Sequence, residues 1–186
     1  MNWLAFGVLA WLLLGLEVGL RDALRLGTTS VAPSFVVPLA VYVALSTSPR
    51  LATWAAVVLG IGLDLTWLLP RTDGPQAHLI GPYALGLVLA VQLVLALRGL
   101  VIRTHFFTHA ALGIVGAAVV HIVVVGMLAA REIAGDPIAF NGIDQLRTRM
   151  LAAVFTGVLA FFLSFVLVRL DPVMGFHLDR SGRYLR

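Results

Sequence analysis

The chain has 186 residues, of which 60% are apolar and 12% are charged, and its mean hydropathy is +1.00. A soluble domain is about 45–50% apolar and about 25% charged. The composition therefore excludes a soluble globular or disordered protein and predicts an all-α integral membrane protein. Cysteine is absent, which excludes disulfides, thiolate metal sites and cysteine nucleophiles. The net charge of +4 is typical of cytoplasmic loops in membrane proteins and does not indicate nucleic-acid binding.

Six apolar runs follow one another along the chain, and each has the length or composition of a transmembrane helix. They cover about residues 2–20, 31–45, 51–69, 79–97, 107–130 and 150–168. Pro38 lies inside the short second run and predicts a kinked or tilted span. These runs predict one transmembrane domain over residues 1–170 and a basic cytoplasmic tail over 171–186. No internal sequence repeat is evident, and residues 144–149 are expected to lead into the sixth span.

Arginines near the span ends set the expected orientation, because cytoplasmic loops carry an excess of basic residues. They are slightly more numerous on the side that holds both termini. We therefore expect both termini to lie in the cytoplasm.

Asp64 lies well inside the third run, where an ionisable residue is costly and suggests a role. Ala52, Ala56 and Gly60 precede it at four-residue spacing and share its helix face. Stripes of small residues let helices approach closely in lipid, so Asp64 should face a neighbouring helix. A structural carboxyl bonded to that neighbour is favoured over a directly chemical role.

His121 lies inside the fifth run and follows a similar stripe of His109, Gly113 and Ala117. Because His121 and Asp64 lie at similar predicted depths, we hypothesise that they meet across a helix interface. The alternative is that His121 bonds a backbone carbonyl and has no further role.

Three further patterns are more easily explained by structure than by chemistry. Glu17 precedes Arg21 by four residues, the favourable order for an interfacial ion pair. The tryptophans Trp3, Trp54 and Trp67 lie near predicted membrane interfaces and fit an aromatic belt. The sixth run carries a packing stripe of Ala152, Thr156, Ala160 and Ser164.

Catalytic and cofactor motifs are not found in the sequence. Phe106 follows His105, so the glutamate of an HExxH zinc motif is missing. No P-loop, nucleotide-binding glycine fingerprint or GxSxG motif occurs. We therefore expect a protein that is not an enzyme and that needs no cofactor or metal.

The chain resembles the bacterial rod shape-determining protein MreD family over nearly its whole length. The resemblance rests on six spans and on three segments: PSFVVPLAVYVAL at 33–45, GIGLDL at 60–65 and IGPYAL at 80–85. It implies a non-enzymatic scaffold of the cell-elongation machinery in the bacterial inner membrane. Such a scaffold would bind a single-span MreC-type partner, contact membrane lipid and help link MreB filaments to peptidoglycan synthesis. It also implies a bundle similar to the substrate-binding subunits of energy-coupling-factor transporters.

The alternative function is that transporter subunit itself, which takes up a vitamin or another small molecule. It would need a polar, aromatic-lined pocket at one end of the bundle. The candidate pocket residues are Trp67, His78, Tyr83, Asn141 and Asp144.

Overall fold

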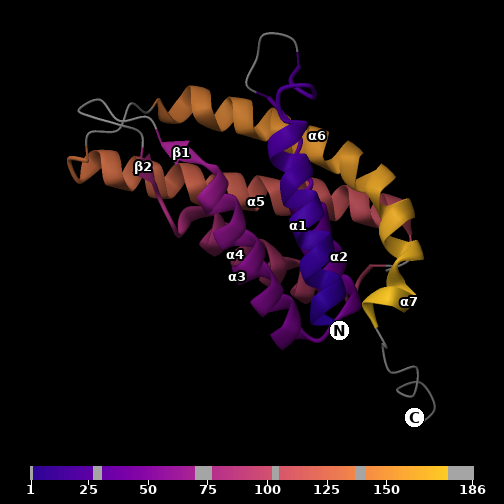
Figure 1. Ribbon diagram of the computed structural model, residues 1–186. Coiled ribbons are helices and arrows are strands. Elements are labelled where there is room, and N and C mark those ends of the chain that lie inside the picture. Colours follow the sequence, from indigo (N-terminus) through magenta and orange to yellow (C-terminus); the bar gives the residue numbers. More distant parts are fainter. Residues whose placement is uncertain (1, 27–30, 70–76, 102–104, 137–140, 176–186) are drawn as a thin grey trace.

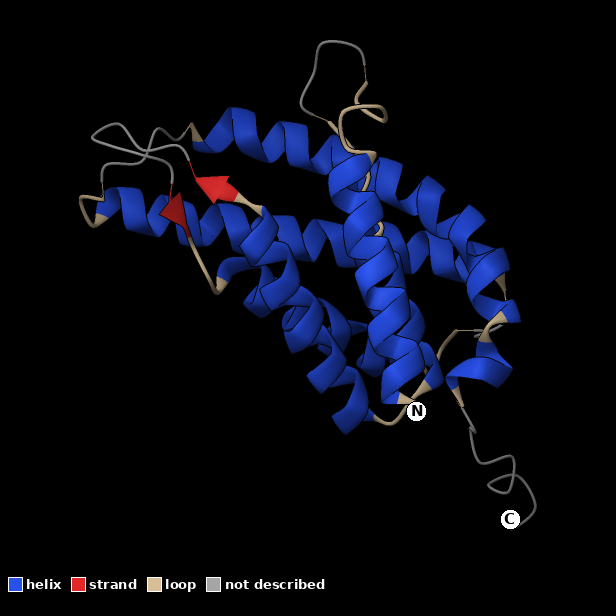
Figure 2. Ribbon diagram, viewed as in Figure 1, coloured by secondary structure: helices blue, strands red, loops and turns tan. Residues whose placement is uncertain are grey.

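The computed structural model describes residues 2–26, 31–69, 77–101, 105–136 and 141–175. These residues form an all-helical bundle with one very short two-stranded ribbon (Figure 2). The helices are α1 (Trp3–Gly19), α2 (Val36–Ser46), α3 (Pro49–Thr66), α4 (Pro82–Leu97), α5 (Phe106–Ile133), α6 (Gly142–Arg169) and α7 (Asp171–Met174). The strands β1 (Leu68–Leu69) and β2 (Ala77–His78) pair antiparallel between α3 and α4. The tail predicted over 171–186 begins in α7, and its residues 176–186 lie outside the described part.

Local sequence explains where several helices begin. The Asn2 side chain accepts hydrogen bonds from the N–H groups of Leu4 and Ala5 and so caps α1. Pro49 and Pro82 open α3 and α4, where a missing N–H needs no partner. Gly81 precedes α4 with a φ of 134°, which a residue with a Cβ rarely adopts.

The long helices α5 and α6 run side by side and antiparallel, and α3 packs against α4 beside them (Figure 1). The short helix α2 lies in the middle and touches α1, α3, α4, α5 and α6. The helix α1 lies across the outside of the bundle and buries only Phe6, Ala10 and Leu13. The N–H of Asn2 donates to the carbonyl of Met174 at 2.8 Å, so the two ends of the described chain are joined.

The prediction of a helical span over 31–45 is wrong in its first five residues, because α2 begins only at Val36. The side chain of Glu17 bonds the N–H groups of Phe35 and Val36 and thereby fixes where this helix starts. Pro38 lies in the first turn of α2, where it needs no hydrogen bond and causes no kink. All ten residues from Val36 to Leu45 are buried, so α2 is the central helix of the bundle.

The sixth helix is longer than the prediction of 150–168, since α6 begins at Gly142. Residues 144–149 lie inside the helix and do not merely lead into it. Asp144 in the first turn suits the positive end of the helix dipole. The apolar pattern missed residues 142–149 because most of them are polar or charged, although Arg149 is buried.

Two of the described helices, α5 and α6, are long and apolar enough to cross a membrane. Each has 28 residues, which corresponds to about 42 Å at about 1.5 Å per residue, against about 30 Å of hydrocarbon. The helices α1, α2 and α4 are apolar but shorter.

Candidate functional site

The small-residue stripes predicted from the sequence all lie inside the bundle. Every member is buried: Ala52, Ala56, Gly60, His109, Gly113, Ala117, Ala152, Thr156, Ala160 and Ser164. A Cβ added at Gly60 would lie 2.3 Å from the Cα of Ala84, so α3 and α4 are in backbone contact. A Cβ added at Gly113 would lie 2.7 Å from the Cβ of Ala160 in α6. These stripes are therefore occupied by neighbouring helices of the same chain.

Asp64 holds the start of α4. Its two carboxylate oxygens accept hydrogen bonds from the backbone N–H groups of Gly81 at 2.8 Å, Tyr83 at 2.9 Å and Ala84 at 3.1 Å. The first N–H groups of a helix have no partner within the helix, so a carboxylate placed there satisfies them and complements the helix dipole. Asp64 is therefore a cap supplied by the preceding helix.

Glu17 has the same role at the start of α2. Its Oε2 atom accepts hydrogen bonds from the Phe35 N–H at 2.6 Å, the Ser34 hydroxyl at 3.1 Å and the Val36 N–H at 3.3 Å. The predicted ion pair between Glu17 and Arg21 is not present, since no nitrogen of Arg21 lies within 4.0 Å of the carboxylate. The N-terminus of α2 is the partner of Glu17, and it comes 17 to 19 residues later in the chain.

The two carboxylates make a structural repeat that was not recognised in the sequence. Glu17 follows Gly15 and Leu16, and Asp64 follows Gly62 and Leu63. Each lies near the end of one helix and binds the start of the next, 17 to 19 residues ahead for Glu17 and 17 to 20 for Asp64. The sequence signal for this repeat is the similar number of residues that separates each carboxylate from the start of the next helix.

The hypothesis that Asp64 and His121 meet is wrong, because the carboxylate oxygens of Asp64 are bonded to α4 and none bonds the imidazole. His121 is 8% exposed, and its Nδ1 atom has no hydrogen-bond partner. The alternative expectation, a hydrogen bond between His121 and a backbone carbonyl, is therefore also not met at Nδ1. The ring lines a cavity instead.

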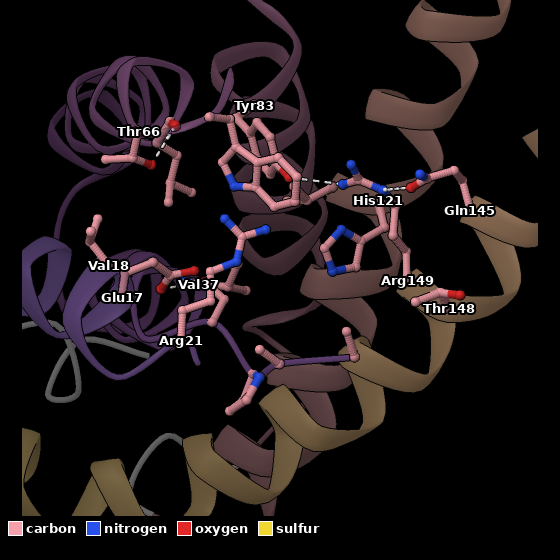
Figure 3. A pocket seen from close by; sticks show the side chains of 17 residues that line it. Glu17, Val18, Arg21, Val37, Thr66, Tyr83, His121, Gln145, Thr148 and Arg149 are labelled. Atoms are coloured by element: carbon pink, nitrogen blue, oxygen red, sulfur yellow. Dashed lines mark hydrogen bonds between the residues drawn. The ribbon is translucent and has the colours of Figure 1, made fainter. Parts of the chain in front are cut away.

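This cavity lies between the ends of α1 and α3, the starts of α2 and α4, the middle of α5 and the first turns of α6. Its volume is about 210 Å³. Figure 3 shows side chains from these elements around it, including Glu17, Arg21, Tyr83, His121 and Arg149. A polar cavity of this size inside a highly apolar bundle is the candidate functional site.

Two arginines meet at one aromatic ring in the cavity. The guanidinium carbon of Arg21 lies 3.8 Å from the centre of the Trp67 ring, and that of Arg149 lies 5.0 Å from it. These are cation–π distances. Trp67 also stacks on Tyr83, with ring centres 5.7 Å apart. Trp67, predicted as part of an aromatic belt and as a candidate pocket residue of a transporter subunit, therefore contacts both arginines and Tyr83 in the cavity wall.

Hydrogen bonds fix Arg149 more firmly than Arg21. The Nη1 of Arg149 donates to the Tyr83 hydroxyl at 2.8 Å, and its Nε donates to Gln145 at 3.4 Å (Figure 3). Arg149 is 8% exposed. Burial lowers the pKa of the Arg21 guanidinium from its ordinary value, which means that its charge is poorly solvated.

The cavity has an excess of positive charge. Glu17 is the one acid among the lining residues, and its Oε2 is engaged by the start of α2. Within the described part of the chain, neither Arg21 nor Arg149 has a carboxylate within 4.0 Å. Buried charges are normally paired, and the carboxylate of Glu17 does not pair directly with the buried Arg149. Two arginines against one acid leave the cavity with an excess positive charge, which indicates a site for an anion.

The pocket residues predicted for a transporter subunit are only partly brought together. Trp67 and Tyr83 line the cavity, whereas His78, Asn141 and Asp144 do not. The Asn141 amide donates to the Asp144 carboxylate at 2.7 Å on the exposed start of α6.

Sequence reasoning missed Arg149, Gln145 and Thr148, which were read as a loop before the sixth span. The signal that could have found them is their spacing, since Gln145, Arg149 and Ala152 share one face of a helix.

Over the described residues no cluster of three or more histidine, aspartate or glutamate side chains is arranged to hold a metal ion. Comparisons of the chain with protein families, with curated proteins and with solved structures found no match.

Proposed function

We propose that the chain is a non-enzymatic, multi-pass scaffold of the bacterial inner membrane, of the MreD type, within the cell-elongation machinery. In this proposal α1 to α6 are the six spans, the bundle is similar to that of energy-coupling-factor substrate-binding subunits, and both termini lie in the cytoplasm. Large apolar side chains on the outer surface support a membrane location, among them Leu4 at 77%, Trp11 at 75% and Phe162 at 62% exposure.

The outer face of α1 is the observation that carries the scaffold proposal. Gly7, Trp11, Gly15 and Gly19 follow one another at four-residue spacing and are all exposed. A Cβ added at any of the three glycines would meet no atom within 4 Å. The stripes inside the bundle are already filled, whereas this one is open. Gly15 and Gly19 form a GxxxG pattern of the kind that admits another helix in lipid, which suits a single-span MreC-type partner.

Co-purification from native membranes tests this proposal. The double variant G15L/G19L fills the open face of α1, and we expect it to lose the MreC-type partner that the wild-type chain retains. The control is G126L, because Gly126 on α5 is also exposed with nothing within 4 Å. Recovery of the partner with G15L/G19L as with wild type would show that α1 is not the docking face. Absence of the partner from the wild-type preparation would contradict the elongation function itself.

The second candidate is a substrate-binding subunit of an energy-coupling-factor transporter, and the cavity favours it. Two of its expected aromatic residues, Trp67 and Tyr83, do line a polar cavity at span ends. The same co-purification separates the two functions, since a transporter subunit would bring down an ATPase and a coupling subunit in place of a single-span protein.

A further inference from the structure

We propose that the cavity lined by Arg21, Trp67, Tyr83, His121 and Arg149 binds a phosphate group. This inference goes beyond the scaffold role, which uses the outer face of α1. Gly7, Trp11, Gly15 and Gly19 do not line the cavity, so binding there and partner docking on α1 can be tested separately.

The first argument is charge. Arg21 and Arg149 come from different elements and lie 3.8 Å and 5.0 Å from the same ring centre. Two like charges that line one cavity repel each other. No acid of the described chain neutralises Arg149, which is almost fully buried. An anion bound in the cavity offsets this repulsion and supplies a counter-charge for Arg149, which Glu17 does not pair with directly.

The second argument is independent of the arginines. The Nδ1 atom of His121 is buried without a hydrogen-bond partner, and the imidazole lines the cavity. Buried polar atoms normally have a partner. A phosphate oxygen accepts a hydrogen bond from His121 in the tautomer with its proton on Nδ1. The imidazole therefore contributes a third donor, from α5, to the same space.

The third argument selects phosphate over a carboxylate. One guanidinium already matches both oxygens of a carboxylate in a bidentate pair. Two guanidiniums and an imidazole, which come from three different elements, present more donors than two oxygens occupy. A phosphate group carries additional oxygens that face several directions. The cavity volume of about 210 Å³ is also far larger than a single water requires.

The phosphate can come from a phospholipid headgroup or from a soluble phosphate compound, and two probes distinguish these sources. The first is inorganic phosphate, and the second is dihexanoyl phosphatidylglycerol. The full chain is purified in a phosphate-free maltoside detergent and titrated with each. Trp67 is the reporter in the triple variant W3F/W11F/W54F, whose replaced tryptophans are 46%, 75% and 57% exposed.

Three variants of this reporter protein decide whether binding occurs in the cavity. R21Q removes one charge from a half-buried position, and R149K keeps the charge of Arg149 but loses its planar fork. Each should weaken binding by about 10- to 100-fold, the range expected for loss of a charge-assisted hydrogen bond. The control R25Q makes the same charge change at a surface residue that pairs with Asp22 at 2.9 Å. It should leave the dissociation constant within about twofold.

The outcomes are distinct. Binding of inorganic phosphate that R21Q and R149K weaken and R25Q does not supports the site and assigns it to a soluble phosphate compound. The same pattern with phosphatidylglycerol alone supports the site and assigns it to a lipid headgroup. Because R149K changes a buried residue, R21Q decides the result if R149K does not fold. Absence of binding by both probes, or an equal effect of R21Q and R25Q, overturns the proposal.

Discussion

Replacing Asp64 with alanine is expected to destabilise the fold strongly. The change removes the acceptor of three backbone N–H groups at the start of α4, those of Gly81, Tyr83 and Ala84. An N–H left without an acceptor costs about 1–3 kcal/mol when buried and less where water reaches it. Tyr83 is buried, whereas Gly81 and Ala84 are half-buried. We take about 2 kcal/mol for the lost hydrogen bond of the Tyr83 N–H and about 1 kcal/mol for each of those of Gly81 and Ala84. The total destabilisation is then about 4 kcal/mol.

This loss is large against a typical folding stability of about 5–15 kcal/mol. For a chain of this length each 1 kcal/mol shifts the melting temperature by about 2–4 °C, so D64A should melt about 8–16 °C below wild type. Thermal unfolding of the purified protein in detergent, followed by loss of the monodisperse peak on size exclusion, measures the shift. D64N keeps one amide oxygen as an acceptor and should lie about halfway.

The matched control is D22A, which removes an exposed acid in a surface pair with Arg25. Its effect should stay under about 1 kcal/mol. If D64A melted as wild type does, or no lower than D22A, the cap would not stabilise the bundle and the reasoning would be refuted. If D64A could not be purified folded, D64N would still give the graded shift.

Three other substitutions test the packing and capping described above by the same melting assay. E17A should destabilise the fold to an extent similar to D64A, since it removes the acceptor of three hydrogen bonds at the start of α2; a shift as small as that of D22A would contradict the equivalence of the two caps. G60A should cost at least about 1–3 kcal/mol, because the new Cβ would lie 2.3 Å from the backbone of α4, whereas G126A, in open space, should be neutral or stabilising. Y42F removes the hydroxyl that donates to the Asp171 carboxylate in α7 and should destabilise the fold by about 1–3 kcal/mol. An unchanged melting temperature would show that this bond does not stabilise the bundle.

Sequence reasoning located the helices because apolar runs and their breaks are local properties. It placed α1 and α4 within three residues of their observed ends. It failed at the start of α2, which depends on contact with a distant segment, and at the start of α6, whose polar residues break the apolar pattern. Nothing near residue 35 indicates that Glu17 will cap the helix that begins at Val36.

The polar residues were harder to interpret for the same reason. Asp64 was correctly expected to face a neighbouring helix, but its partners are backbone groups and not the side chain of His121. Arg149 carries a charge at the edge of an apolar run, which ordinarily indicates a membrane interface. Only the tertiary structure shows that it turns inward to Tyr83 and Trp67.

The shortness of α2 has a consequence for how the protein is made. Its 11 residues correspond to about 16 Å of helix, roughly half of the hydrocarbon thickness. In the proposed six-span arrangement, α2 is therefore too short to cross the lipid as an independent segment. In lipid, the non-helical residues before it must have their backbone groups bonded by protein. Glu17 precedes α2 in the chain and accepts hydrogen bonds from the N–H groups of Phe35 and Val36. The N–H of Ser34 instead donates to the hydroxyl of Thr156, which lies 122 residues later in the chain. The hydrogen bonds at the start of α2 are therefore complete only once α6 has been synthesised.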